Sequence, residues 1–307
     1  MRTLIELPSW LGDCIMTTPA IEGFVNLNPD VEITVIGSAI SVEAMLPHPN
    51  IVEGFVLDKS YLTLSRTVKS LGTFDIFFSF RSSIRSSITK YFVQASKKYQ
   101  FNKNRYKQGH QVEKYTNFVS ISLGLRLTPG PLKLYTQHIE KSEKPRLGIN
   151  PGASYGSAKR WYPEEFAKVA QELSSQYDIV IFGGLDEQDM AGDIEKGLIK
   201  YGVNNYQNLA GKTSISELIS QIASLDLFVT GDSGPMHVAA AFCVPTVAIF
   251  GPTKDNETSQ WMNPRSTIVK KDLDCQPCMK RICPLKHHDC MRLIGAEEVL
   301  KAVEAFN

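Results

Sequence analysis

The chain has 307 residues, of which 43% are hydrophobic and 21% charged, and these values predict a packed globular protein with room for two domains. The formal net charge of +1 argues against a general nucleic-acid binder. No apolar run reaches the roughly 20 residues of a membrane span. The first residues lack the long apolar core of a signal peptide. We therefore expect a cytoplasmic protein.

The first half of the chain alternates short apolar strands with helical stretches. We predict strands over residues 3–7, 32–36, 51–56, 75–78 and 98–101, and helices over residues 18–28, 61–71, 82–93 and 112–123. This alternation is typical of βαβ units, in which helices cover both faces of a parallel sheet. Residues 127–144 interrupt it with Pro, Gly and a charged run. We interpret them as the link between an N-terminal domain, 1–140, and a C-terminal domain, 145–307.

A second alternating set follows this linker. We predict strands over residues 146–150, 179–182, 225–229 and 246–250, and helices over residues 163–174 and 215–223. The sequence thus predicts an α/β protein with two Rossmann-like, doubly wound parallel-sheet domains facing a cleft. Ligands of such sheets bind beyond the carboxyl ends of the strands. A final helix over residues 296–305 could pack back on the first domain.

The most informative segment is the turn Gly231-Asp232-Ser233-Gly234, which connects the strand at 225–229 to a helix with Pro235 in its first turn. A helix N-terminus presents unpaired backbone N–H groups and the positive end of a dipole, and together these favour a phosphate. The neighbouring Asp232 could accept hydrogen bonds from sugar hydroxyls. The alternative is an ordinary turn in which Asp232 and Ser233 act as helix caps.

Other polar clusters also follow strands. Residues 150–161 form a small-residue loop that ends in Lys159 and Arg160, and we favour binding of phosphate there over a loop of solvated cations. Glu187 could hold ribose hydroxyls or cap the next helix. Asp13 lies in a Gly-containing loop after the first strand. It could be a helix cap, or a general base whose ionised form is favoured by the helix dipole.

Residues 81–114 are strongly basic. The cations are Arg81, Arg85, Lys90, Lys97, Lys98, Lys103, Arg105, Lys107 and Lys114, and the interleaved aromatic residues are Tyr91, Phe92, Tyr99, Phe101 and Tyr106. Such a run is usually a solvated face. Since only Glu113 opposes it, an anionic acceptor or a membrane surface is a second interpretation. RNA is a further candidate, but no RNA-binding signature accompanies the run.

Four cysteines gather near the C-terminus, with His287 and His288 in the last gap between them: Cys275, Cys278, Cys283 and Cys290. They could form a tetrahedral structural site for zinc or iron. The spacing is not that of a standard zinc finger, where two close pairs are well separated. Reduced thiols packed without an ion are the alternative.

These motifs, in this order, resemble the ADP-heptose:lipopolysaccharide heptosyltransferases, an inverting glycosyltransferase family (family 9) with the GT-B fold. The matching segments are Gly12-Asp13 with Thr18-Pro19, then 151–153 with 159–161, then 231–237. The tail from Cys275 to Cys290 looks most like the heptosyltransferase II branch, which adds the second heptose of the inner core.

The resemblance implies transfer of a heptose from ADP-L-glycero-D-manno-heptose to the heptose-Kdo inner core of lipopolysaccharide or lipooligosaccharide. Asp13 would be the general base and Lys159 would neutralise the departing diphosphate. The implied donor-binding residues are Ser154, Tyr155, Lys159, Glu187, Asp232, Ser233, Gly234 and His237, and the acceptor-binding residues are Arg81 and Arg85. The N-terminal domain would bind the acceptor and the C-terminal domain the donor, and no cofactor is required. The anionic, lipid-linked acceptor implies a cytoplasmic enzyme on the inner face of the inner membrane.

Two alternatives remain open at this stage. One is a heptosyltransferase with another acceptor, such as the first or third core position or a protein. The other is a non-catalytic paralogue that binds a nucleotide sugar, although the presence of both Asp13 and Lys159 argues against it.

Overall fold

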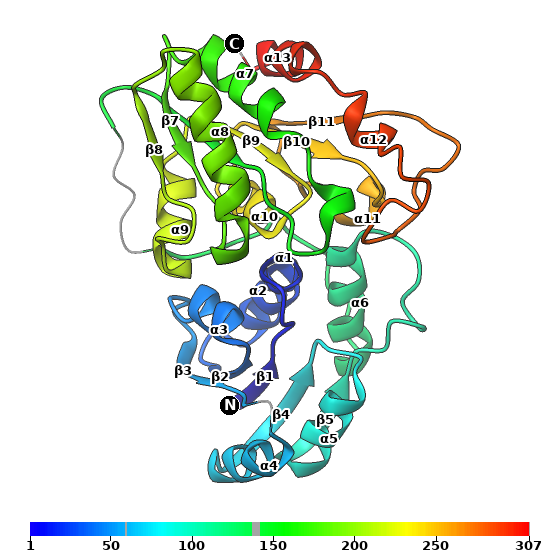
Figure 1. Cartoon of the computed structure of the whole chain (residues 1–307). Helices are drawn as coiled ribbons and strands as arrows, with labels where there is room; N and C mark the ends of the chain where they lie inside the picture. Colours follow the sequence, from blue (N-terminus) through cyan, green and yellow to red (C-terminus); the bar gives the residue numbers. More distant parts are fainter. Residues whose placement is uncertain (59, 137–141, 307) are drawn as a thin grey trace. The chain divides into compact units, whose positions relative to one another are not determined.

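The computed structural model describes residues 1–58, 60–136 and 142–306. The chain divides into two compact units, Met1–Gln137 and His138–Asn307. Each unit is a parallel sheet with helices packed on it (Figure 1), which confirms the predicted α/β class. Residues 137–141 of the predicted linker lie outside the described residues. The assignment of one unit to the acceptor and the other to the donor stays a prediction.

The first unit contains five parallel strands in the order β3-β2-β1-β4-β5. Its strands are β1 (Arg2–Glu6), β2 (Glu32–Gly37), β3 (Ile51–Val56), β4 (Thr73–Ser79) and β5 (Gln94–Gln100). Its helices are α1 (Leu11–Ile15), α2 (Thr18–Leu27), α3 (Ala39–Met45), α4 (Tyr61–Ser70), α5 (Ile84–Phe92) and α6 (Gln111–Leu123). The chain reverses its direction across the sheet between β1 and β4, which is where such sheets bind ligands.

Neighbouring residues of each strand point to opposite faces of the sheet, because side chains alternate along a strand. Phe77 packs in one cluster with Leu64 and Val68 of α4. The next residue, Phe78, meets Phe24 of α2 and Phe118 of α6 edge to face, with centroid distances of 5.5 and 6.0 Å. Both faces of the sheet are therefore buried, as the alternating sequence pattern predicts.

The second unit contains six parallel strands in the order β11-β10-β9-β6-β7-β8. They are β6 (Arg146–Asn150), β7 (Asp178–Ile181), β8 (Tyr206–Asn208), β9 (Leu227–Gly231), β10 (Thr246–Phe250) and β11 (Ser266–Lys270). The helices are α7 (Pro163–Leu173), α8 (Gln188–Lys200), α9 (Ile215–Ala223), α10 (Gly234–Ala241), α11 (Asp255–Thr258), α12 (Asp289–Arg292) and α13 (Ala296–Glu304), with short 3-10 turns η1 (Ser157–Lys159) and η2 (Leu185–Glu187). This is the dinucleotide-fold strand order, with its reversal between β6 and β9.

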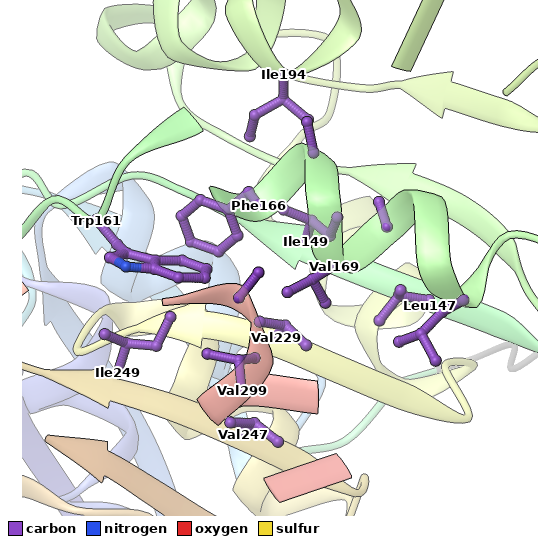
Figure 2. Close-up of a cluster of buried hydrophobic side chains, with 14 of the residues drawn as sticks. Leu147, Ile149, Trp161, Phe166, Val169, Ile194, Val229, Val247, Ile249 and Val299 are labelled. Carbon is purple, nitrogen blue, oxygen red and sulfur yellow. The ribbon is translucent and has the colours of Figure 1, made fainter. Parts of the chain in front are cut away.

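The main core of the second unit lies between its sheet and the helices α7, α8 and α13. Figure 2 shows the indole of Trp161 beside the ring of Phe166, with Val299 of α13 near the strand residues Val229 and Val247. The final helix therefore buries its apolar side in its own unit, against α7, β10 and β11. The opposite face of the sheet buries Ala248 and Phe250 under Met236 of α10.

Several elements differ from those predicted. The predicted strand over residues 225–229 ends at Val229, whereas β9 continues to Gly231. The elements α3, α8, β8, β11 and α12 were not predicted. The three residues of β8 and most of β11 are partly exposed, so neither segment has the continuous apolar run that marks a buried strand. In α8, Gly192 and Gly197 interrupt the helical pattern of buried side chains.

Candidate active site

A buried ion pair lies at the carboxyl ends of β6 and β9. The Nζ atom of Lys159 is 2.7 Å from Oδ2 of Asp232, and the two side chains are 11% and 6% exposed. The hydroxyl of Thr253, which follows β10, donates to the same carboxylate oxygen at 2.6 Å. The structure thus brings together two residues predicted from separate motifs, at the reversal point of the sheet where ligands bind.

The turn after β9 is shorter than predicted. Gly231 is the last residue of the strand and Gly234 the first of α10, so only Asp232 and Ser233 form the connection. The side chain of Ser233 does not cap the helix. Its hydroxyl instead accepts from Nδ2 of Asn150 at 3.2 Å and lies 3.1 Å from the hydroxyl of Thr230. The first N–H groups of α10 are thus left without this cap, as an anion site requires.

The other residues predicted to bind the donor differ in their burial and in their contacts near this turn. Tyr155 places its ring 5.3 Å from Nζ of Lys159. The carboxylate of Glu187 accepts from the N–H of Gly184 at 2.8 Å and lies against Gly152, where a Cβ atom would overlap it. His237 lies one turn into α10 and is buried, and Ser154 is exposed. Glu187 thus joins the loop that follows β6, whereas the structure does not bring Ser154 into the buried site.

Asp13 lies in the first unit, close to the carboxyl end of β1. The structure corrects the predicted loop here, because Leu11–Ile15 forms the short helix α1 with Asp13 in its first turn. Burial raises the pKa of the Tyr115 hydroxyl well above its usual value, and the charge of Asp13 raises it further. Burial also raises the pKa of the Cys14 thiol to about 12, with a smaller contribution from Asp13. Asp13 therefore lies close to two groups that stay protonated at neutral pH.

The first unit also contains a buried carboxylate that sequence reasoning overlooked. Glu6, at the end of β1, is fully buried and accepts hydrogen bonds from Ser79 at 2.6 Å and Ser86 at 3.0 Å. Nη1 of Arg81 is 3.7 Å away. Burial raises the pKa of this carboxyl, and the hydroxyl bonds and the nearby charges of Arg81 and Arg85 oppose that rise. The two predicted acceptor-binding arginines therefore lie around one buried carboxylate.

The basic stretch is only partly exposed. Phe101 is buried and stacks on Tyr106, with ring centroids 5.4 Å apart, and Tyr99 stacks on Phe78 in the core. Lys114 is also buried. By contrast, Tyr91 on α5 is 80% exposed. Most of the interleaved aromatic residues thus serve packing, whereas Tyr91 of α5 is exposed.

The four C-terminal cysteines do not form a preassembled metal site. In the part of the chain that the structure describes, no three His, Cys, Asp or Glu side chains are arranged to hold a metal ion. Cys290 is buried against Gly251, whereas three thiols are only partly buried, those of Cys275, Cys278 and Cys283. Burial raises the pKa of Cys290 to about 11, and the neighbouring thiols add to the rise.

The sequence-based suggestion of a tetrahedral zinc or iron site finds no support in the described residues. A closed site needs four thiolates around one point. Cys290 enters the core while Cys275, Cys278 and Cys283 stay partly exposed, and the thiols of these three lie near enough to add to the rise in the pKa of Cys290.

The geometry of the second unit suits an anionic group attached to a polyol. A cation and an uncapped helix N-terminus can bind phosphate, and the carboxylate between them can accept hydrogen bonds from hydroxyls. The glycosyltransferase family 9 (heptosyltransferase) matches residues 64–288, more than half of the chain. This chain belongs to that family. It is therefore a glycosyltransferase.

Individual relatives agree with this family. The chain is 41% identical over 311 residues to lipooligosaccharide heptosyltransferase 2 of Campylobacter jejuni, covering 98% of this chain and 97% of the relative. Escherichia coli ADP-heptose lps heptosyltransferase II matches with a TM-score of 0.83 and 23% identity, over 100% and 98% of the two chains. An E. coli heptosyltransferase solved with ADP gives a TM-score of 0.80 at 14% identity over both full chains. The predicted GT-B class of fold is thus confirmed.

Two buried polar residues beside the predicted site residues were not selected from the sequence. Thr253 lies three residues after the end of β10, so its position was a usable signal. Glu6 is the only charged residue in the apolar run at positions 3–7, and an acid there is rarely buried without partners. Its hydroxyl partners come from β4 and α5, more than 70 residues away, and only the fold brings them together.

Proposed function

We propose that this glycosyltransferase transfers a heptose from ADP-heptose to the heptose-Kdo inner core of lipopolysaccharide or lipooligosaccharide, as the second heptose. The observation that carries the proposal is the buried Lys159–Asp232 pair beside the N-terminus of α10. It occurs in a chain similar over nearly its full length to a lipooligosaccharide heptosyltransferase 2. Phosphate and sugar groups are what such a pair and helix terminus can recognise together.

On the donor side, Lys159 neutralises the diphosphate while the N-terminus of α10, at Ser233 and Gly234, donates backbone hydrogen bonds to it. Asp232 then accepts hydrogen bonds from heptose hydroxyls. The ion pair with Lys159 and the hydrogen bond from Thr253 hold the Asp232 carboxylate in place for this role. Glu187 binds the ribose hydroxyls in this proposal, and Tyr155 and His237 line the donor site.

On the acceptor side, Asp13 removes the proton from the attacking hydroxyl. That oxygen forms a bond to the anomeric carbon while the bond from this carbon to the ADP oxygen breaks, which inverts the centre. The electron pair leaves with the diphosphate, whose charge Lys159 and the helix dipole stabilise. These fixed charges supply the stabilisation that a metal ion gives in other transferases, so the chemistry requires no cofactor.

Arg81 and Arg85 would bind the anionic core acceptor. We predict that Arg81→Gln together with Arg85→Gln raises the acceptor KM about 10-fold and weakens its dependence on salt. The affinity for ADP should stay as in the wild type. Neutral Gln is preferred to Glu because a second carboxylate beside buried Glu6 would perturb folding. Steady-state kinetics at several salt concentrations measures the effect.

The exposed Arg126 offers a matched control for this pair, since Arg126→Gln makes the same type of charge change in the same unit outside the basic stretch. It should leave the acceptor KM unchanged. Equal damage to donor and acceptor binding in the double variant would contradict the assignment.

We also propose that the enzyme docks on an anionic membrane surface through α5 and the adjacent basic stretch. Ile84 and Tyr91 of α5 are 82% and 80% exposed, and Lys97 and Lys103 lie on exposed positions nearby in the sequence. Apolar side chains flanked by cations are typical of segments that lie in the membrane interface. Among the described helices, none is long and apolar enough to cross a bilayer.

For the cysteine cluster, the finding of one buried and three partly exposed thiols leads us to expect structural thiols rather than a zinc or iron site. Elemental analysis of protein purified without chelator should give well below one equivalent of either metal. Thiol titration after unfolding should count every cysteine of the chain as reduced. About one equivalent of metal, lost in Cys278→Ser or Cys283→Ser, would contradict this expectation.

The proposal is tested most specifically by acceptor choice. Purified enzyme receives ADP-heptose and either a core acceptor ending in Kdo or one that already carries the first heptose. We expect transfer only to the second acceptor. Transfer to the Kdo-terminated acceptor alone would assign the enzyme to the first heptose instead.

A further inference from the structure

The cysteine-rich tail is physically joined to the loop that carries Lys159. The N–H of Ala158 donates to the carbonyl of Arg281 at 3.0 Å, and the hydroxyl of Tyr155 donates to the carbonyl of Met279 at 2.7 Å. One residue position in the loop, Gly156, has no room for a Cβ atom because the Arg281 carbonyl occupies that space. The tail thus holds the loop in place through two hydrogen bonds to its own backbone carbonyls and through this close packing.

Two further bonds fix the same loop to the end of the tail. Nε2 of His288 lies 2.9 Å from the carbonyl of Ala158, and the indole N–H of Trp161 donates to the carbonyl of Ile294 at 2.9 Å. Because Trp161 is fully buried, this second bond lies in the core. The position of Lys159, between Ala158 and Trp161 in sequence, therefore depends on the tail.

Two cations share the ring of Tyr155. Nζ of Lys159 lies 5.3 Å from its centroid, and Cζ of Arg281 lies 5.4 Å from it. Both distances are within the range of cation–π attraction. The ring therefore holds the Arg281 guanidinium in the neighbourhood of the Lys159 ammonium, although the two residues are more than 100 positions apart in the chain.

The Lys159–Asp232 pair does not by itself neutralise the negative charge of a nucleoside diphosphate. Lys159 is paired with Asp232, so these two side chains carry no net charge together. A diphosphate brings at least two negative charges. Arg281 is exposed and forms no ion pair within the described part of the chain, so its guanidinium has donors to offer. A planar guanidinium can donate two parallel hydrogen bonds to phosphate oxygens.

We propose that Arg281 is a second cationic contact for the donor diphosphate, and that the cysteine-rich tail is a wall of the donor site that positions both Arg281 and Lys159. This inference rests on the proposed function, since it takes a nucleoside diphosphate sugar as the donor. It gives the tail a role in binding, and this role does not require a metal ion.

The test compares Arg281→Ala and Arg281→Lys with the wild type, using calorimetric titration with ADP and with AMP. We expect the dissociation constant for ADP to rise about 10-fold in Arg281→Ala, the effect of losing one charge-assisted contact, and to rise less in Arg281→Lys. AMP lacks the second phosphate, so its affinity should change less than that of ADP. The salt dependence of ADP binding should also weaken.

Lys280→Ala is the matched control, because Lys280 is the adjacent exposed cation and its removal changes the net charge equally. It should bind ADP as the wild type does, and thermal melts should show that all variants are folded. Unchanged ADP affinity in Arg281→Ala, or equal losses for AMP and ADP, would overturn the inference. A wild-type protein that binds no ADP would instead overturn the proposed function, and the inference with it.

Discussion

Asp13→Asn should lower kcat by about 100- to 10,000-fold, the usual contribution of a general base, while the affinity for ADP-heptose stays close to that of the wild type. The Asn side chain has the size of Asp but cannot accept the proton of the acceptor hydroxyl. Because Asp13 and Lys159 belong to different compact units, the change should leave the Lys159–Asp232 pair intact. Single-turnover kinetics and calorimetric titration with the donor measure the two quantities separately.

Asp30→Asn provides the control, since Asp30 is exposed in the same unit and loses the same charge. It should retain normal turnover. If Asp13→Asn kept most of its kcat, Asp13 would serve only as an acidic residue in the first turn of α1, and another group would have to act as the base.

The second large effect is expected at Lys159. Lys159→Ala should lower kcat/KM for the donor about 100-fold or more, because the ammonium binds the diphosphate and stabilises the charge that builds on it as the bond breaks. The same change leaves the carboxylate of Asp232 buried without its cation, and this should lower thermal stability. Donor kinetics at saturating acceptor and a thermal melt therefore report two different consequences.

A double variant separates the loss of catalysis from the loss of thermal stability. Lys159→Ala combined with Asp232→Asn removes the unpaired charge, and the Asn side chain can still accept from Thr253. We expect its melting temperature to return towards the wild-type value while kcat/KM stays low. Recovery of activity together with stability would show that Lys159 acts only as a structural partner of Asp232.

The sequence predicts well those features that depend on local pattern. The capping box at Ser214 and the strand bounds of β6 and β10 match the structure, because short apolar runs and helix caps are local signals. The site motifs were also accessible, since each follows a strand and parallel strands place their carboxyl ends together.

What the sequence does not show is pairing across distance. The bond of Asp232 to Lys159, the burial of Glu6 among serine hydroxyls, and the contact of Arg281 with Tyr155 all join residues that are more than 70 positions apart. These contacts depend on which strands become neighbours in the sheet, and no local pattern encodes that order.

The same limit explains two interpretations that the fold revises. Phe101 and Tyr106 look like part of a binding surface in sequence, but the fold turns them into the core beside Phe118. In the tail, the cysteines look like ligands of one ion, but no three His, Cys, Asp or Glu side chains among the described residues are arranged to hold one. Spacing along the chain gives the residue types available, and packing decides where each side chain points.

The most direct test of the central claim is the mass of the acceptor after reaction. Purified protein is incubated with ADP-heptose and a core acceptor that ends in the first heptose, and the products are examined by mass spectrometry and by assay of released ADP. We expect a gain of one heptose per acceptor, with one ADP released for each transfer and no product in the Asp13→Asn variant. An acceptor of unchanged mass, in the presence of folded protein and both substrates, would contradict it.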